Sequence, residues 1–202
     1  MPRHDPNVHA STLPTLLLGL LLLIGLFPGI FHSIWSAPLG FLPFFGSSSR
    51  TSSPHTMTWF QKGFTLQPRS RGSYLITDQV VQALPELRDY KVGLLNLFIQ
   101  HTSCGLSLNE NFDTDVREDM SDALDRIAPE TGPKGEALYR HDAEGLDDMP
   151  AHIKSALVGT SLTIPIKDGK LATGTWQGIW YLEFRASKHQ RRVMATIQGE
   201  KA

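Results

Sequence analysis

Three polar segments contain most of the residues in this sequence that could do chemistry. They cover residues 100–111 (QHTSCGLSLNEN), 140–159 (RHDAEGLDDMPAHIKSALVG) and 161–179 (SLTIPIKDGKLATGTWQGI). Their histidines, carboxylates, amides and hydroxyls exceed what a structural core requires, because a buried polar group is costly unless it finds a partner. We therefore expect these segments to form the functional site.

The histidines of these segments suggest a metal site. His101 follows a long apolar run, His141 lies in a polar stretch, and His152 falls near the start of a predicted helix. Three neutral imidazoles can bind a divalent metal and leave one position open for water or a phosphate oxygen. Their spacing matches no local ligand motif, and each histidine alone is more simply a hydrogen-bonded structural residue. We predict that His101, His141 and His152 converge on one divalent ion, zinc or magnesium.

The same segments supply candidates for catalysis and substrate binding. Glu110 is a carboxylate between two amides, and we predict it as a catalytic acid or base together with His101. The polar neighbours predicted to bind substrate are Thr102, Ser103, Asn109 and Asn111. Cys104 is the only cysteine, so no intrachain disulfide can form. Since its neighbours are mostly small, we interpret it as a buried apolar residue rather than a nucleophile.

Most of the elements that must position these residues are predicted strands. The strand candidates are residues 59–66, 161–166, 171–173, 179–185 and 192–198. Residues 91–100 are apolar on both faces, which is typical of a central strand covered on both sides. Asp168 and Gly169 predict a tight hairpin turn, because both central residues of such a turn need positive φ.

Two or three short helices accompany these strands. One follows Asp78, and a second covers residues 115–127, where Asp115 and Glu118 have the spacing of a capping box. A third covers residues 150–158, since proline suits the first helical position and glycine the position just past the end. The predicted fold class is therefore α+β, an antiparallel sandwich-like sheet with two or three short helices.

The composition describes one ordinary globular domain. The chain has 202 residues, of which 41% are hydrophobic and 19% charged, and its formal net charge is −1. This near-neutral balance, with no basic cluster, excludes a nucleic-acid-binding surface.

Residues 1–56 differ from the rest, and three interpretations stay open. Residues 13–31 carry no charge, but they reach the about 17–25 apolar residues of a membrane span only by including two prolines. A cleaved signal peptide is a second interpretation, although its cleavage site is poor. A third is that Met57 is the true start. The protein is accordingly predicted to be membrane-anchored through residues 13–31, or cytoplasmic if Met57 begins it, with residues 57–202 as the domain.

Residues 57–200 resemble the YjbQ family, whose members are sometimes labelled secondary thiamine-phosphate synthase. The family signature is met by Ser161, Ile164, Ile166, Gly169, Gly174-Thr175-Trp176-Gln177 and Ile179. The segments around His101–Asn111 and His141–Ser155 are also similar to the family. The resemblance implies an α+β fold with a sandwich-like sheet, a homotrimer, and a polar site near the subunit contacts.

The label implies transfer of hydroxymethylpyrimidine from its diphosphate to thiazole phosphate, with release of pyrophosphate. Such a reaction on a phosphorylated small molecule needs cations for the leaving group, which Lys154 and Arg192 could supply. Glu110 and Trp176 would then face the developing pyrimidine cation, with Gln177 beside them, although Trp176 is more simply a core residue. The alternatives are a metal-dependent hydrolase with the three-histidine site, and a non-enzymatic trimeric module that binds metal or anions.

Overall fold

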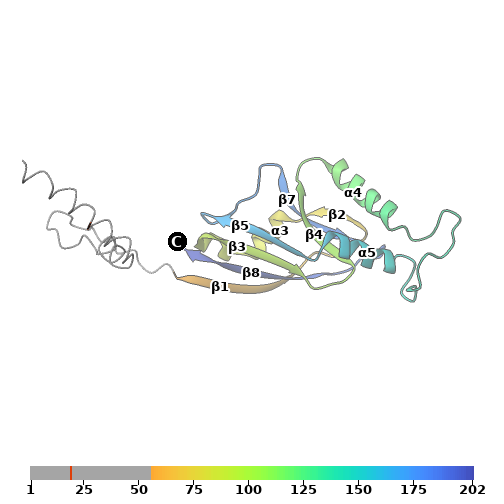
Figure 1. Ribbon diagram of the computed structural model, residues 1–202, viewed down its shortest axis with the longest axis horizontal. Helices are drawn as coiled ribbons and strands as arrows, with labels where there is room; N and C mark the ends of the chain where they lie inside the picture. Colours follow the sequence, from red (N-terminus) through yellow and green to blue (C-terminus); the bar gives the residue numbers. More distant parts are fainter. Residues whose placement is uncertain (1–18, 20–55) are drawn as a thin grey trace, which may run out of the picture. The chain divides into compact units, whose positions relative to one another are not determined.

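The computed structural model describes residue 19 and residues 56–202, and the latter form two antiparallel sheets packed face to face (Figure 1). The larger sheet has the strand order β1 (Met57–Thr65), β8 (Arg192–Lys201), β3 (Tyr90–Ile99), β5 (Ser161–Lys167) and β6 (Lys170–Leu171). The smaller sheet has the order β2 (Gly72–Leu75), β7 (Gln177–Glu183) and β4 (Cys104–Glu110). The helices are α3 (Thr77–Ala83), the 3-10 helix η2 (Pro85–Asp89), α4 (Thr114–Ile127) and α5 (Asp148–Val158). The predicted α+β class with an antiparallel sandwich is confirmed.

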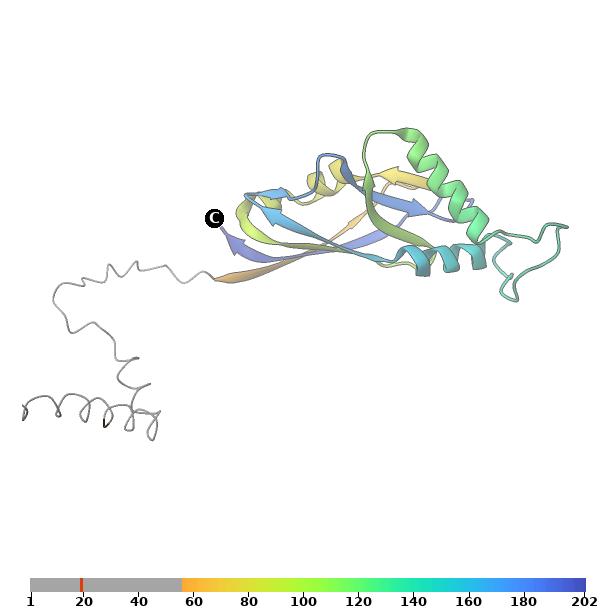
Figure 2. The same ribbon diagram turned by 45° about the horizontal axis from the view of Figure 1, so that its top comes forward.

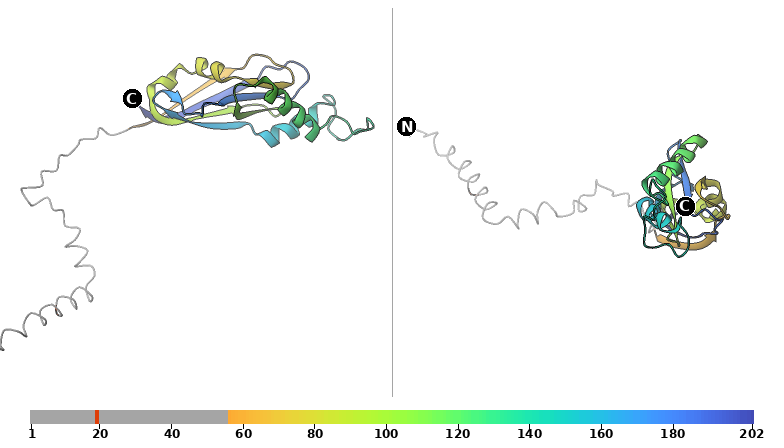
Figure 3. Two further views of the ribbon diagram at one scale, coloured as in Figure 1. Left: turned by 90° about the horizontal axis from the view of Figure 1, so that it is seen from above. Right: turned by 90° about the vertical axis from the view of Figure 1, so that its right-hand side faces the viewer.

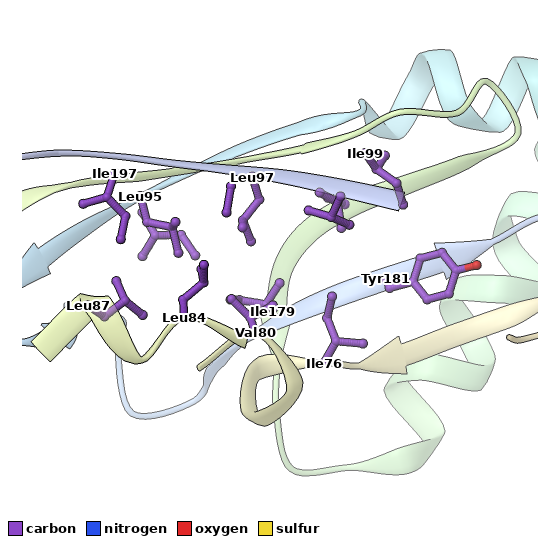
Figure 4. Packing of buried hydrophobic residues seen from close by; sticks show 14 of the residues in the cluster. Ile76, Val80, Leu84, Leu87, Leu95, Leu97, Ile99, Ile179, Tyr181 and Ile197 are labelled. Atoms are coloured by element: carbon purple, nitrogen blue, oxygen red, sulfur yellow. The ribbon is translucent and has the colours of Figure 1, made fainter. Parts of the chain in front are cut away.

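The main core lies between the two sheets. Leu95, Leu97 and Ile197 of the larger sheet face Ile179 and Tyr181 of β7, and all five are buried (Figure 4). Val80, Leu84 and Leu87, from the segment of α3 and η2, close the same core at one end. Alternate residues of each strand point to opposite faces, so this core takes every second residue of β3 and β8.

A second core lies on the other face of the smaller sheet. Trp180 and Leu182 alternate with the main-core residues of β7 and pack against Leu124 of α4 and Ala151 of α5. β7 is therefore covered on both faces, and residues 56–202 form three layers: large sheet, small sheet and helices (Figure 2). α4, α5 and the connection between them gather at one end of the sheets (Figure 3).

Within residues 56–202, no helix covers the outer face of the larger sheet, and this face carries few charges. Its rows run in register across four strands: Trp59, Gln198, Leu94 and Pro165 form one, and Gly63, Met194, Phe98 and Ser161 form another. Trp59 is 68% exposed and Leu94 47%. β3 is central, as expected, but the described residues cover only one of its faces, so the prediction that both faces are covered is wrong for this part of the chain.

Local signals explain where several elements begin and end. The 168–169 turn has positive φ at both residues, 49° at Asp168 and 74° at Gly169, so the hairpin prediction is confirmed. α5 begins at Asp148, two residues before the predicted Pro150, and ends before Gly159, whose φ is 97°. α4 is capped by Asp113, whose carboxylate accepts a hydrogen bond from the Asp115 amide, so the predicted capping box of Asp115 and Glu118 is wrong.

The expectation of a transmembrane helix finds no support in the described residues. No helix in the described part of the chain is long and apolar enough to cross a membrane. The predicted anchor over residues 13–31 lies, apart from Gly19, outside the described residues.

Candidate functional site

Two of the three predicted metal ligands lie together, and an aspartate joins them. His141, Asp148 and His152 each offer one ligand atom, and these atoms all lie within 4.8 Å of one another. Ligand atoms held at about 2.0–2.1 Å from one zinc ion lie at most about 4.2 Å apart, so small side-chain movements would close the site around an ion. His101 is not a member of this group.

Helix α5 and its contacts with β4 position Asp148 and His152. The two residues are four apart, which places them on one face of the helix. The Ser155 hydroxyl donates to the Cys104 carbonyl at 2.7 Å, and the Leu106 amide donates to the Gly159 carbonyl at 3.0 Å. These bonds seat α5 against the start of β4. His141 reaches the same place from the long connection between α4 and α5.

The hydrogen bond of His152 leaves its other nitrogen free to bind a metal. Its Nδ1 lies 2.9 Å from the Thr102 carbonyl oxygen, which can only accept a hydrogen bond. Nδ1 therefore carries the proton, and Nε2, the atom facing Asp148 Oδ1 at 3.5 Å, keeps its lone pair. A backbone carbonyl that fixes the tautomer in this way is a common feature of histidine ligands in metal sites.

Asp148 is a buried carboxylate with one unsatisfied oxygen. Its Oδ1 accepts a hydrogen bond from Arg185 Nη1. Its Oδ2 lies 2.8 Å from His141 Nε2, which makes an ion pair only if that ring is protonated, and it accepts no hydrogen bond of good geometry from any described residue. A buried anionic oxygen without a hydrogen bond is destabilising, and a cation shared with the two histidines would satisfy it.

Arg185 also forms a second set of contacts, which fixes the residues just before Asp148. Its Nε donates to Asp147 at 3.1 Å and its Nη2 to the Glu144 carbonyl at 2.9 Å. Burial alone would raise the pKa of Asp147, but hydrogen bonds from the Ala186 amide and from Arg185 lower it below the ordinary value. The acidic residues around the site thus outnumber its one arginine, which favours a cation.

His101 lies nearby but is engaged elsewhere. Its Nε2 accepts a hydrogen bond from the Arg192 amide at 3.0 Å, so the lone pair is in use. Burial, and then the nearby charge of Arg191, lower the pKa of His101 below its usual value and favour the neutral ring. His101 and His152 line one shallow groove of about 700 Å³ with an apolar floor that includes Phe98 and Ala156. The structure therefore brings His101 to the edge of the metal group rather than into it.

Most of the other predicted polar residues near this end of β4 are already paired. Ser103 accepts a hydrogen bond from Arg191 at 2.9 Å. Lys154 is buried and bonded to Asp125. Arg192, at the start of β8, is exposed. Burial raises the pKa of the Cys104 thiol to about 12, which agrees with its interpretation as a buried apolar residue.

A second group of predicted residues lies at the opposite end of β4. Glu110 is the last residue of β4, six positions after Cys104, which contacts α5, and an extended chain rises about 3.3 Å per residue. Glu110 accepts a hydrogen bond from the Asp113 amide at 3.0 Å. Within one chain it therefore lies roughly 20 Å along the strand from the end of β4 near the metal group, too far to act on a water held there.

The GTWQ tetrapeptide joins this second group as a closed turn. Gln177 accepts a hydrogen bond from the Gly174 amide at 2.8 Å, and Asn111 donates to the carbonyls of Thr175 and Gln177. Asn109 accepts from the Glu110 amide at 2.8 Å. Trp176 is 62% exposed and stacks edge-on against Phe112, so its interpretation as a core residue is wrong.

Asp148 is the residue that the sequence analysis missed. The helix predicted from the sequence begins at Pro150, which leaves Asp148 outside it and outside the predicted ligands. An aspartate and a histidine four residues apart on one helix present their side chains to the same side. Starting the helix at Asp148 would have revealed the pair.

Comparison with known proteins places the chain in a family. Residues 62–200 match the family described as "UPF0047 protein YjbQ-like". The chain belongs to this family. UPF0047 protein YjbQ of Escherichia coli O157:H7 is 49% identical over 142 residues, which cover 70% of this chain and 99% of that protein. A UPF0047 protein of Synechocystis is 46% identical over 120 residues, covering 59% of this chain and 79% of its own.

Solved structures agree with the family at the level of the fold. An uncharacterized conserved protein of the YjbQ/UPF0047 family from Clostridium acetobutylicum is 34% identical, with a TM-score of 0.55 over 68% of this chain and 98% of its own. A protein of unknown function from Sulfolobus solfataricus has a TM-score of 0.62 at 23% identity, covering 72% of this chain and 100% of its own. The second likeness shows the fold alone.

These relatives correct the predicted activity. The family description and the names of the relatives carry no thiamine-phosphate synthase or other transferase activity. The prediction that the chain transfers hydroxymethylpyrimidine to thiazole phosphate is therefore withdrawn. The three-histidine hydrolase is withdrawn with it, since the described ligand group contains two histidines and Asp148.

Proposed function

We propose that the protein binds one divalent metal ion, with Zn²⁺ preferred, through His141, Asp148 and His152. The observation that carries this proposal is the unsatisfied Oδ2 of the buried Asp148, which lies beside a histidine nitrogen. Two imidazoles and one carboxylate are ligands suited to zinc and leave a fourth position open. A metal bound with an open position would act as a Lewis acid on a ligand or a water.

The ligand residues themselves have defined tasks in this proposal. His152 binds through Nε2 because Thr102 holds its Nδ1 proton. Arg185 takes one oxygen of Asp148 and leaves the other for the metal. The groove beside His152, with its apolar floor, would receive the organic part of a ligand that reaches the open position.

Metal titration of the full chain tests this function. We expect about one zinc ion per chain, measured by competition with a chromogenic chelator. Replacing His152 by Ala or Asp148 by Asn should weaken binding at least 100-fold, because each removes one of three ligands. His189→Ala is the matched control, since His189 lies in a polar turn and is not one of the three ligand residues, and it should leave the affinity unchanged. Equal affinity in all four proteins would refute the site.

We also propose that copies of the chain associate through the outer face of the larger sheet, as a homotrimer. Trp59, Leu94 and Phe98 are exposed on this face, and the residues paired with them on neighbouring strands are uncharged. This supports the proposal, since large contiguous apolar patches on a protein surface often mark interfaces. Leu94→Glu should yield a smaller species in light scattering after size exclusion. Leu138→Glu, an exposed leucine in the long connection, should not. A monomeric parent protein would contradict the proposal.

A further inference from the structure

A cleft between β2 and α4 lies apart from the metal group and has the size of a small-molecule site. Its volume is about 680 Å³, within the range of about 300–1,000 Å³ that is usual for ligand pockets. None of the three metal-site residues lines it. Its walls include three arginines, Arg69, Arg71 and Arg117, from two separate segments of the chain.

One of these arginines is already neutralised. Arg71 Nη2 lies 2.7 Å from Asp122 and 2.5 Å from Asp125, so two carboxylates hold it. Arg71 therefore has a structural role, because it links the residue just before β2 to α4. It adds no free positive charge to the cleft.

The other two arginines are oriented without a carboxylate. The guanidinium of Arg69 lies 4.9 Å from the centre of the Tyr74 ring, and the Arg69 backbone pairs with His189. Arg117 donates to the Asp113 carbonyl at 3.3 Å. Within the described part of the chain neither guanidinium has a carboxylate within 4.0 Å. Both guanidinium groups are therefore positioned by neutral contacts, and their positive charges can bind an anion.

The guanidinium groups of Arg69 and Arg117 suit a phosphate as that anion. The Ser73 and Ser121 hydroxyls also line the cleft, but they hydrogen-bond each other at 2.9 Å, and Ser121 donates to the Arg117 carbonyl at 3.1 Å. Because each hydroxyl has one proton and both protons are engaged, the arginines are the contacts to the anion. Arginine pairs with phosphate through two parallel hydrogen bonds. Glu118 also lines the cleft and offsets one of the two free positive charges.

We propose that this cleft binds the phosphate group of a small phosphorylated molecule, with Arg69 and Arg117 as its cationic contacts. The Tyr74 ring and the apolar side chains of Leu75 and Ile76 form the wall beside it, suited to the organic part of the ligand. The site is separate from the metal and does not need it.

The test is calorimetric titration of the full chain with inorganic phosphate and with pyrophosphate, in EDTA and at low salt. EDTA removes bound metal, and low salt limits screening of exposed charges. We expect saturable binding. Arg69→Gln and Arg117→Gln should each weaken it about tenfold, the lower end of the effect of a lost charge-assisted hydrogen bond. Melting curves of each variant will show that it is folded.

Matched controls distinguish binding in this cleft from nonspecific attraction of an anion to a positively charged surface. Arg126→Gln removes the same charge from an exposed position on the same helix, outside the cleft, and should leave binding unchanged. Glu118→Gln removes the opposing charge and should tighten binding about threefold. The proposal is overturned if Arg126→Gln weakens binding as much as the cleft variants do, if no variant differs from the parent, or if His152→Ala abolishes binding.

Discussion

At the scale of single residues, the buried charge of Glu183 organises the end of β7 that leads to Arg185. Its two oxygens accept hydrogen bonds from the Phe184 and Arg185 amides, from Tyr181 and from Arg191. Arg191 in turn donates to Ser103. A buried carboxylate is tolerated when all of its partners are in place, and here they connect β7 with the chain around His101.

Glu183→Gln tests the importance of this network for stability. The change keeps the shape but leaves Arg191 as a buried cation without its anion, so the free energy of unfolding should fall by about 3–5 kcal/mol. Urea denaturation followed by circular dichroism measures the loss. The exposed Glu118→Gln should change stability by less than about 0.5 kcal/mol. Equal stability of the two variants would refute the role given to Glu183.

At the scale of elements, the cap of α4 offers a direct test of local structure. The Asp113 carboxylate accepts a hydrogen bond from the Asp115 amide at 2.9 Å and so satisfies one of the free backbone donors at the start of the helix. Asp113→Ala should cost about 0.5–2 kcal/mol of stability, the usual value of such a cap. The control is Asp119→Ala, at an exposed position within the same helix. A larger loss at Asp119 than at Asp113 in thermal unfolding would contradict the assignment.

Elements with strong local signals could be predicted from the sequence. The 168–169 turn needs positive φ at two positions, and Asp-Gly meets that need, so the hairpin of β5 and β6 was found. β2 has only four residues, GSYL, without alternation of polar and apolar side chains, and it was missed. Its position depends on pairing with β7, which is a contact between distant parts of the chain.

The candidate site could also be predicted only in part, because some of its contacts join distant parts of the chain. His141 and His152 were named because histidine in a polar segment is a visible signal. The participation of Asp148 depends on where α5 begins, and the engagement of His101 depends on the Arg192 amide, 91 residues away in sequence. The contact of His101 leaves no pattern in the sequence, whereas Asp148 and His152 have the four-residue spacing that a helix beginning at Asp148 would bring together.

At the scale of the whole molecule, one set of ion pairs joins the layers near the helices. Asp125 of α4 contacts Arg71, which leads into β2, and the buried Lys154 of α5. Burial would raise the pKa of Asp125, but hydrogen bonds and charge from Lys154 and Arg71 outweigh it and lower the pKa below the ordinary value. Asp125 thus connects α5, which carries two of the proposed metal ligands, to the rest of the fold.

The lowered pKa of Asp125 predicts how stability depends on pH. The unfolded chain holds this carboxyl near its ordinary pKa of about 3.9, whereas the folded chain holds it lower, so the unfolded state binds the proton more readily. Its contribution to stability is fully present above about pH 5 and is lost as the pH falls below 4 through the folded value. Asp125→Asn should lower the midpoint of urea unfolding at pH 7 and should flatten its decline between pH 5 and 3.

The matched control for Asp125→Asn is Asp119→Asn, which changes an exposed carboxylate on the same helix that forms no ion pair with any described residue. It should leave both the midpoint at pH 7 and the acid decline close to those of the parent protein. Because Lys154 is buried, removing the charge of Asp125 should also loosen α5, and zinc affinity should fall with stability. If Asp125→Asn declined as steeply in acid as the parent protein does, the carboxylate would not be the group that links these layers.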